Sequence, residues 1–237
     1  MSKEIKLRDG SKVLDRRLDA LISFDERSRK FPIRATISQK KPRSYSWSCA
    51  QCLDQGNEGA CVGFGITHEL IARPAPVQGL DDKFAREKIY WPAQKIDDWF
   101  GGAYPGARPF YEGTDMKSGL KIVTGLGYCD EYRWAFSFDE FLLGVGYNGP
   151  AIVATNWYEG MEKIDENGFI HPTGRVRGRH CYVFLSVDIK KKRAKMHNSW
   201  GLRFGINGEA YVPFDEVEVL LKHQGEAAFL VGRHSRV

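Results

Sequence analysis

Helix-forming and strand-forming patterns occupy different parts of this chain, and that separation limits the folds it can adopt. Between residues 45 and 145, apolar spacing predicts helices at 61–72, 81–96 and 115–124, and a capping box predicts a fourth after Ser137. From about residue 150 the pattern predicts short strands at 151–157, 180–188, 195–200, 209–212 and 227–231. Helices followed by strands indicate an α+β fold with two lobes and a cleft between them.

Local signals refine these elements. Thr114 is the expected N-cap of the third helix, and Pro92 should kink or break the second. Residues 1–44 are basic and poor in apolar residues, and we predict an extended arm with one short helix, suggested by Leu14, Leu18, Leu21 and Ile22. The chain is therefore divided into an arm (1–44), a helical lobe (45–145) and a β-rich lobe (146–237).

Composition excludes several classes of protein. The 14 Phe, 10 Tyr and 6 Trp can fill a large core, which a disordered chain lacks. No apolar stretch approaches the ~20 residues of a membrane-spanning helix, and the first residues show no signal peptide. The net charge of +5 is spread out, and its densest run, at 190–193, is expected in a solvated turn. We therefore expect no membrane or nucleic-acid partner and a cytoplasmic protein, or a virion-associated one if a phage encodes it.

The count of five cysteines is odd, and without a secretion signal it indicates mostly reduced thiols, at least one of them free. Cys61 is the candidate nucleophile because it begins the predicted helix at 61–72. The free N–H groups and positive dipole end of a helix N-terminus lower a thiol pKa. Thiolate chemistry on an acyl group also needs a base, a group that orients it, and oxyanion donors; His180, Asn198 and Gln55 are the candidates.

Four pieces of sequence, in one order, resemble the papain-like cysteine peptidases over roughly residues 45–215. They are Asp54-Gln55-Gly56 with Gly59-Ala60-Cys61; Glu112-Gly113-Thr114 followed by a helix and Gly127-Tyr128-Cys129; Gly178-Arg179-His180; and Asn198-Ser199-Trp200-Gly201. The last piece and the Gln-to-Cys spacing are the specific signals. The resemblance implies a two-lobe fold, with a helical N-terminal lobe, a β-barrel-like C-terminal lobe and the active site in the cleft between them.

The same resemblance implies a cysteine endopeptidase that acts on polypeptides and needs neither a cofactor nor a metal. Cys61 would attack the peptide bond, and His180 would serve as general base and acid. Asn198 would orient the imidazole under the cover of Trp200, and the Gln55 amide with the Cys61 N–H would hold the oxyanion. The residues expected to bind substrate are Gly113, Thr114, Arg179, Cys181 and Trp200.

The chain departs from common members of the family at several positions. Glu58 stands where many plant and animal members have a disulfide cysteine, which fits a reducing compartment, and Val62 stands where they have tryptophan. Cys181 follows the histidine where a small residue is usual, so the pocket for the substrate's second side chain should differ. Residues 1–44 are fewer than the family's usual inhibitory prodomain. We therefore expect a structural arm and no large zymogen, as in compact bacterial or phage members.

Two further motifs are discounted. Cys49-Ala50-Gln51-Cys52 has the spacing of a metal or redox pair, but no second pair follows at zinc spacing, so plain thiols or a disulfide to Cys129 are favoured. The run at 144–149 matches GxGxxG but lies between a helix and a strand, the reverse of a dinucleotide fold, and is interpreted as a turn between the lobes.

Two histidines compete with His180 for the role of base. His68 lies roughly 10 Å along the helix from Cys61, too far for a hydrogen bond. His197 precedes Asn198 in a predicted strand, so its side chain should point to the opposite face.

Two other functions remain open at this point. One is a catalytically silent binding or structural protein, against which the intact set of four residues argues. The other is a peptidoglycan endopeptidase or amidase that uses the same site; the modest positive charge would suit an anionic wall polymer.

Overall fold

The computed structural model describes residues 5–6, 12–13 and 18–235. Its helices are α1 (Cys61–Ile71), α2 (Asp82–Phe84), α3 (Trp91–Ile96), α4 (Met116–Gly125), α5 (Phe138–Tyr147) and α6 (Phe214–Lys222). A π-helical segment (Ala85–Tyr90) joins α2 to α3, and 3-10 turns occur at Glu26–Lys30, Ile33–Thr36 and Glu159–Glu162. The longer strands are β6 (Cys129–Trp134), β7 (Ala151–Tyr158), β8 (Val176–Asp188), β9 (Arg193–His197), β10 (Glu209–Pro213) and β11 (Glu226–Arg233). Two-residue strands are β1 (Ile5–Lys6), β2 (Lys12–Val13), β3 (Ala20–Leu21), β4 (Tyr45–Ser46) and β5 (Thr114–Asp115).

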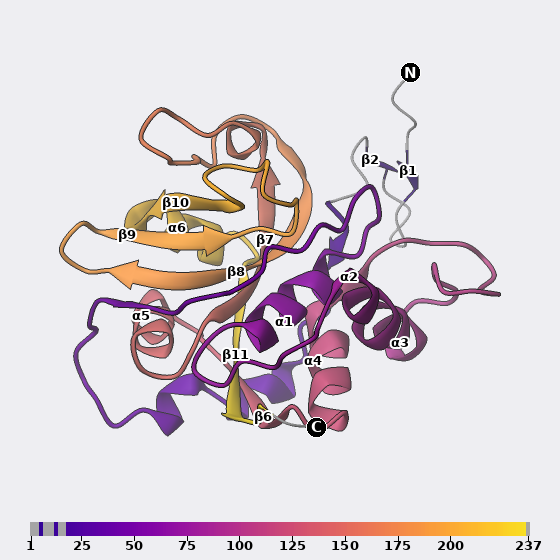
Figure 1. The fold of residues 1–237 in the computed structure, drawn as a ribbon, viewed down its shortest axis with the longest axis horizontal. Helices are drawn as coiled ribbons and strands as arrows, with labels where there is room; N and C mark the ends of the chain where they lie inside the picture. Colours follow the sequence, from indigo (N-terminus) through magenta and orange to yellow (C-terminus); the bar gives the residue numbers. More distant parts are fainter. Residues whose placement is uncertain (1–4, 7–11, 14–17, 236–237) are drawn as a thin grey trace.

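One antiparallel sheet organises the molecule. Its strands follow the order β10-β9-β8-β7-β11-β6, and β4 pairs with β8. Figure 1 shows α1 to α4 on one side and the strands β8 to β10 with α5 and α6 on the other. The α+β prediction is confirmed. The predicted strands are all present, whereas β6, which pairs with β11, and helix α6 were not predicted.

Side chains alternate across this sheet, so each central strand serves two cores. Along β8, Cys181, Val183 and Leu185 pack in one core with α1 and α4. Tyr182 and Phe184, which alternate with them, pack in the other core with α5 and α6. The sheet therefore forms a rigid layer between helices.

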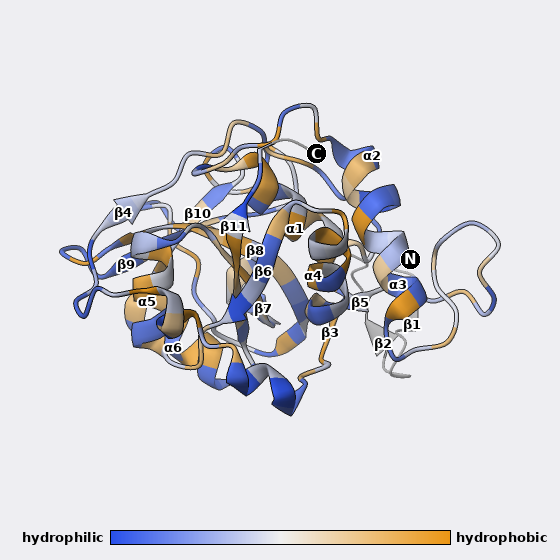
Figure 2. Cartoon of the chain, turned by 90° about the horizontal axis from the view of Figure 1, so that it is seen from below, coloured by the Kyte–Doolittle hydropathy of each residue, from blue (hydrophilic) through white to orange (hydrophobic). Residues whose placement is uncertain are grey.

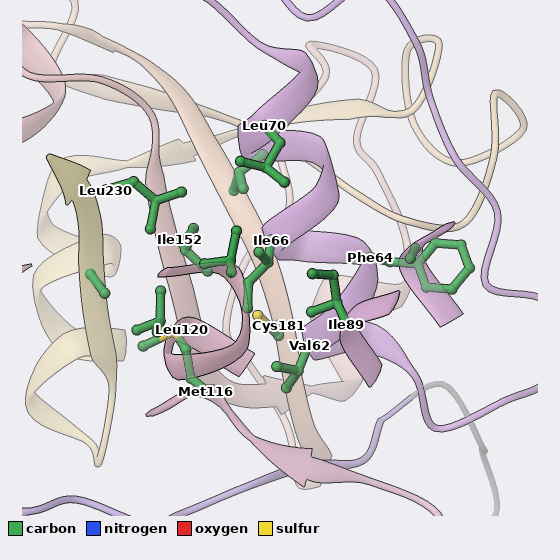
Figure 3. Close-up of a cluster of buried hydrophobic side chains, with 14 of the residues drawn as sticks. Val62, Phe64, Ile66, Leu70, Ile89, Met116, Leu120, Ile152, Cys181 and Leu230 are labelled. Atoms are coloured by element: carbon green, nitrogen blue, oxygen red, sulfur yellow. The ribbon is translucent and has the colours of Figure 1, made fainter. Parts of the chain in front are cut away.

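Helix α1 is buried along its whole length and lies against β8. Figure 2 shows it as a largely hydrophobic helix inside the molecule. Figure 3 shows Ile66 and Leu70 of α1 in a cluster with Leu120, Ile152 and Leu230. Burying one such side chain contributes about 1.5–3 kcal/mol, so the helix is fixed firmly enough to position the residues at its start.

Local structure differs from expectation in the arm and at α4. The α4 cap is Asp115, not Thr114, because the Asp115 carboxylate accepts the Ser118 N–H at 2.8 Å while Thr114 lies in β5. Residues 18–22 do not form a helix; β3 pairs in parallel with β5 instead. The rest of the expected helix, residues 14–17, lies outside the described part of the chain.

Three other expectations are corrected. The GxGxxG run is not a turn, because residues 144–147 form the last turn of α5. Pro92 does not break the second helix, since the chain stays helical through it; the irregularity there is the change from the π-helical segment Ala85–Tyr90 to α3 just before Pro92. All five cysteines are free thiols, and Cys129 contacts the Thr124 hydroxyl at 3.3 Å, so the alternative of a Cys129 disulfide is wrong. In the described part of the chain, no helix combines the length and apolar character needed to cross a membrane.

Candidate active site

Cys61 begins α1, as the sequence predicts, at the point where the helix meets β8. The preceding residue, Ala60, has no side chain that could cap the helix. The N–H groups of Cys181, Asp19 and Val62 interact with the Cys61 sulfur. Because Cys181 directly follows His180, packing of α1 on β8 brings the thiol beside the residue that carries the expected base.

A hairpin places His180 and Asn198 together. His180 lies in β8, Asn198 follows β9, and the two strands are joined by the charged turn at 189–192. The His180 Nε2–H donates to Asn198 Oδ1 at 2.7 Å, in a fully buried pair. This bond places the ring proton of the neutral imidazole on Nε2 and therefore the lone pair on Nδ1.

Aromatic rings enclose the imidazole. The Trp200 ring centroid lies 4.8 Å from that of His180, as the sequence analysis anticipates for a shield over the Asn198 bond. Trp157 lies 5.1 Å away on the neighbouring strand β7, and Tyr182 lies 5.9 Å away. Sequence reasoning missed Trp157; its signal was a large aromatic residue at the end of a strand that pairs with the one holding His180.

Gln55 is buried and tied to the motif at 198–201. Its N–H donates to the Ser199 carbonyl at 2.9 Å, and its side-chain Oε1 accepts the Ser199 hydroxyl at 2.5 Å. Its Nε2 donates to the Glu58 carbonyl at 2.8 Å. The loop of Gln55, just before Cys61, is therefore bonded directly to the motif at 198–201, although the two lie far apart in the sequence.

Residues 18–21 run across the thiol between the two walls of the cleft. Asp19 pairs in parallel with Arg179, beside His180, and β3 pairs in parallel with β5 on the helical side. Leu18, Ala20 and Leu21 are buried. The expectation of a merely structural arm must be revised, because this part of it contacts the candidate nucleophile.

Two glycines make room for this segment. A Cβ on Gly59 would lie 2.6 Å from the Asp19 carboxylate, and a Cβ on Gly113 would lie 2.5 Å from the Asp19 carbonyl oxygen. Gly113 also has a φ of +85°, which disfavours any side chain there. Gly113, which is expected to bind substrate, thus admits the chain's own Asp19.

The pKa of the covered Cys61 thiol is raised, whereas the sequence predicts a lowered pKa. Burial raises the pKa of Cys61 to about 12, and the Asp19 charge raises it further against the lowering effect of the three N–H groups. The prediction of a lowered pKa is wrong for this arrangement because the helix N-terminus is closed off from water. While residues 18–21 cover Cys61, the protonated thiol is therefore favoured over the thiolate.

The expected substrate-binding residues lie along this segment. Arg179 contributes its backbone to the cleft, while its side chain forms a buried ion pair with Glu226 at 3.0 Å. The Thr114 hydroxyl donates to Asp97 at 2.7 Å. The Cys181 side chain points to the α1 side of the sheet, where a Cβ on Gly65 would lie 2.9 Å from its sulfur.

The other end of the cleft is open. A groove of ≈ 620 Å³ adjoins Trp200 and the loop of Gln55, and its lining residues are Asp54, Gly56, Asn57, Glu162, Trp200, Arg203 and Phe204. Glu58, at the position where relatives have a cysteine, forms an ion pair with Arg86 instead. Next to Asn198 in the chain and in space, three side chains that could bind a metal ion lie close together: Cys52, His68 and His197.

Comparisons with known proteins identify the fold. No protein-family model matches the chain, and no curated protein is significantly similar to it in sequence. Xylellain, a cysteine protease from Xylella fastidiosa, is similar with a TM-score of 0.65 and 13% identity over 98% of both chains. The bromelain protease from Ananas comosus, in complex with the E64 inhibitor, gives 0.58 and 14% over 81% of this chain and 100% of that one. A proCathepsin B from Trypanosoma congolense gives 0.56 and 13% over 91% and 86%. The chain therefore has the papain-like fold, as the sequence predicts.

Proposed function

We propose that this protein is a cysteine endopeptidase that hydrolyses peptide bonds in polypeptides. The observation that carries the proposal is the buried His180–Asn198 pair beside the start of α1, where Cys61 stands. The papain-like fold and its cysteine protease neighbours support the same reaction class. Proteins of this fold that lack such a pair would have no base next to the thiol.

The proposed reaction begins when His180 Nδ1 takes the proton of Cys61, giving a thiolate and an imidazolium that Asn198 Oδ1 stabilises. The thiolate attacks the carbonyl carbon of the peptide, and the Gln55 amide and the Cys61 N–H receive the oxyanion. The imidazolium then protonates the leaving amine, and an acyl thioester remains on Cys61. His180 next takes a proton from water, whose oxygen attacks the thioester, and the carboxylic acid and the Cys61 thiol are released.

Substrate can reach Cys61 only after residues 18–21 leave the cleft. The walls that hold this segment include Gly113, Thr114 and Arg179, three of the residues expected to bind substrate. A substrate and the segment would therefore compete for the same backbone groups. The groove beside Trp200 and the loop of Gln55 is not lined by this segment and could hold the rest of a bound polypeptide.

Hydrolysis of labelled unfolded casein by the full-length chain in reducing buffer tests the proposal. We expect hydrolysis by the wild type, faster hydrolysis by Leu18→Ala, and none by Cys61→Ala or His180→Ala. Cys129→Ala, which changes a buried thiol away from the cleft, is the matched control and should retain activity. Activity that survives Cys61→Ala, or inactivity of both the wild type and Leu18→Ala, would overturn the proposal. Cleavage of purified wall peptides but not of casein would overturn the polypeptide substrate.

A further inference from the structure

Four side chains that could bind a metal meet behind the catalytic pair. Cys49 and Cys52 come from the loop before α1, His68 from the interior of α1, and His197 from the end of β9. The Cys52 sulfur and one nitrogen from each histidine lie within 4.8 Å of one another. The side chains that interact with His197 include Cys49 as well as Cys52, and the two imidazole rings lie 4.5 Å apart, edge to face.

The surroundings of the two histidines leave part of each ring unsatisfied. His68 is fully buried and His197 is 3% exposed. Nδ1 of each ring is buried and makes no hydrogen bond with the described residues. His197 Nδ1 lies 3.6 Å from a Glu209 carboxylate oxygen, an ion-pair distance, whereas His68 Nδ1 has neither a hydrogen bond nor an ion pair among the described residues. A buried polar atom without a partner costs about 1–3 kcal/mol. Each ring also makes one hydrogen bond to the loop at 49–55, His68 with the Leu53 N–H and His197 with the Gln51 carbonyl, so both histidines hold the loop that carries the cysteines.

His197 already has the arrangement of a metal ligand. Its Nε2 lies 3.1 Å from the Gln51 carbonyl oxygen, to which an Nε2–H donates. That bond leaves Nδ1, which lies 3.6 Å from Glu209, as the atom that would bind the metal in place of this contact, and ligating histidines commonly donate their other N–H to a carbonyl in this way. Gln51 lies between the two cysteines, so the loop that supplies the thiols also fixes the histidine tautomer.

His68 fits with one change of partner. Its Nε2 accepts the Leu53 N–H at 2.8 Å, so the lone pair of the ring is on Nε2. Ligation through Nε2 would replace that N–H with the metal ion and free an N–H immediately after Cys52 in the chain. Metal–sulfur bonds of about 2.3 Å and metal–nitrogen bonds of about 2.0 Å require ligand atoms roughly 3.3–3.8 Å apart. The ligand atoms of Cys52, His68 and His197 must therefore approach one another by about 1 Å, and Cys49, which interacts with His197, must join them.

We propose that Cys49, Cys52, His68 and His197 bind one zinc ion in a tetrahedral structural site. Two thiolates and two imidazoles form a ligand set typical of structural zinc, and none is left over for a catalytic water. Each thiol loses its proton to solvent on binding, so two protons are released per ion and the two thiolates balance the charge of the metal. The thiols now contact carbonyl oxygens, Cys52 that of Asn198 at 3.6 Å.

This site would join three segments that also carry the catalytic residues. The loop at 49–55 leads to Gln55, α1 begins at Cys61, and His197 is bonded to Asn198. Sequence reasoning discounted the Cys49–Cys52 pair because no second pair follows at zinc spacing. The two histidines come from separate elements, so only the folded chain brings them to the cysteines.

Metal content of the untagged full-length chain tests the proposal. We expect about one zinc per chain by plasma mass spectrometry, about two protons released per ion when zinc is added back after chelation, and a higher Tm with zinc. Cobalt in its place should show tetrahedral ligand-field bands and thiolate-to-cobalt charge transfer. Cys52→Ser and His197→Gln should lose the bound metal, whereas Cys129→Ser should keep it.

Cys61→Ala separates this proposal from the proposed peptidase, because it abolishes hydrolysis and should still bind one zinc. A metal lost on Cys61→Ala, but retained in Cys52→Ser, would place the ion at the catalytic thiol and overturn the site. A wild type that takes up neither zinc nor cobalt, or whose mass shows a Cys49–Cys52 disulfide formed under reducing conditions, would also overturn it. The cobalt spectrum of the wild type decides the question even if a variant fails to fold.

Discussion

Leu18→Ala should uncover the candidate nucleophile. Leu18 is fully buried in the core formed by the sheet with α5 and α6, and it anchors the segment that crosses Cys61. Its carbonyl approaches Gly178 so closely that a Cβ there would lie 2.7 Å away. Removing the side chain weakens docking of the segment while leaving the backbone pairing of β3 and β5 intact. The variant should therefore spend more time with the thiol exposed.

The magnitude follows from burial and from the thiol pKa. Leu→Ala in a core costs about 2–5 kcal/mol, and the lower end of that range, about 2–2.8 kcal/mol, corresponds to a ~30- to 100-fold larger open population. With the pKa of Cys61 raised to about 12, only about one covered thiol in 10⁴ is ionised at pH 8. An exposed thiol near its ordinary pKa of ~8.5 is ionised about a quarter of the time at that pH. Alkylation therefore proceeds through the open state, and its rate should rise ~30- to 100-fold.

The assay is the rate of iodoacetamide labelling at each cysteine of the folded full-length chain, followed by peptide mass spectrometry. Cys129 is the internal control, since it is buried in the core between the sheet and α1. Ile22→Asp is the matched variant, because Ile22 is 44% exposed and lies just beyond β3. We expect faster labelling of Cys61 alone in Leu18→Ala and no change in Ile22→Asp. Equal labelling of Cys61 in wild type and Leu18→Ala, or parallel increases at Cys61 and Cys129, would refute the idea of a local cover.

Three further outcomes are expected. Asn198→Ala removes the 2.7 Å bond to His180, and because bonds to charged groups contribute about 1.5–3 kcal/mol, kcat for casein hydrolysis should fall ~10- to 100-fold with KM little changed. Burial raises the pKa of Glu226 to about 7 despite Arg179, so the native state holds a proton that the unfolded state releases between its ordinary pKa and 7. This group's contribution to the free energy of unfolding therefore falls as pH rises over that window, and Glu226→Gln should flatten the wild-type slope between pH 5 and 7 in urea titrations; an unchanged slope would contradict this. Gly144→Ala places a Cβ 2.3 Å from the Phe229 ring and should lower the urea stability by about 1–3 kcal/mol, whereas Gly125→Ala, with open space at the end of α4, should not lower it.

The fold was predictable from the sequence wherever periodicity and caps agree. The Ser137 hydroxyl accepts the Glu140 N–H at the start of α5, as the capping box predicts. The arm was not predictable in the same way, because the apolar spacing of Leu18 and Leu21 fits a helix as well as a buried strand. Pairing of β3 with β5 decides between the two, and that pairing depends on residues almost a hundred positions away.

The residues of the candidate site could be proposed from the sequence, but the protonation state of the Cys61 thiol could not. Order and spacing identified Cys61, His180 and Asn198, and the hairpin brings the last two together. The pKa of the Cys61 thiol depends on the residues that cover it, whereas the prediction of a lowered pKa considered only the N-terminus of α1. Trp157 was not predicted for a related reason. Its ring lies beside His180 because β7 pairs with β8, which places Trp157 opposite Gly178.

Strand alternation links the proposed catalytic and zinc sites. His197 and Asn198 are consecutive, so their side chains leave the chain in opposite directions, one toward the cysteines and one toward His180. The sequence correctly predicts that the His197 side chain points to the opposite face from that of Asn198. A side chain that faces away from one site must still face something, and at 3% exposure it cannot be solvent. For a buried polar side chain, excluding one partner is therefore a reason to search for another, and here the Cys49–Cys52 loop is the partner that the backbone supplies.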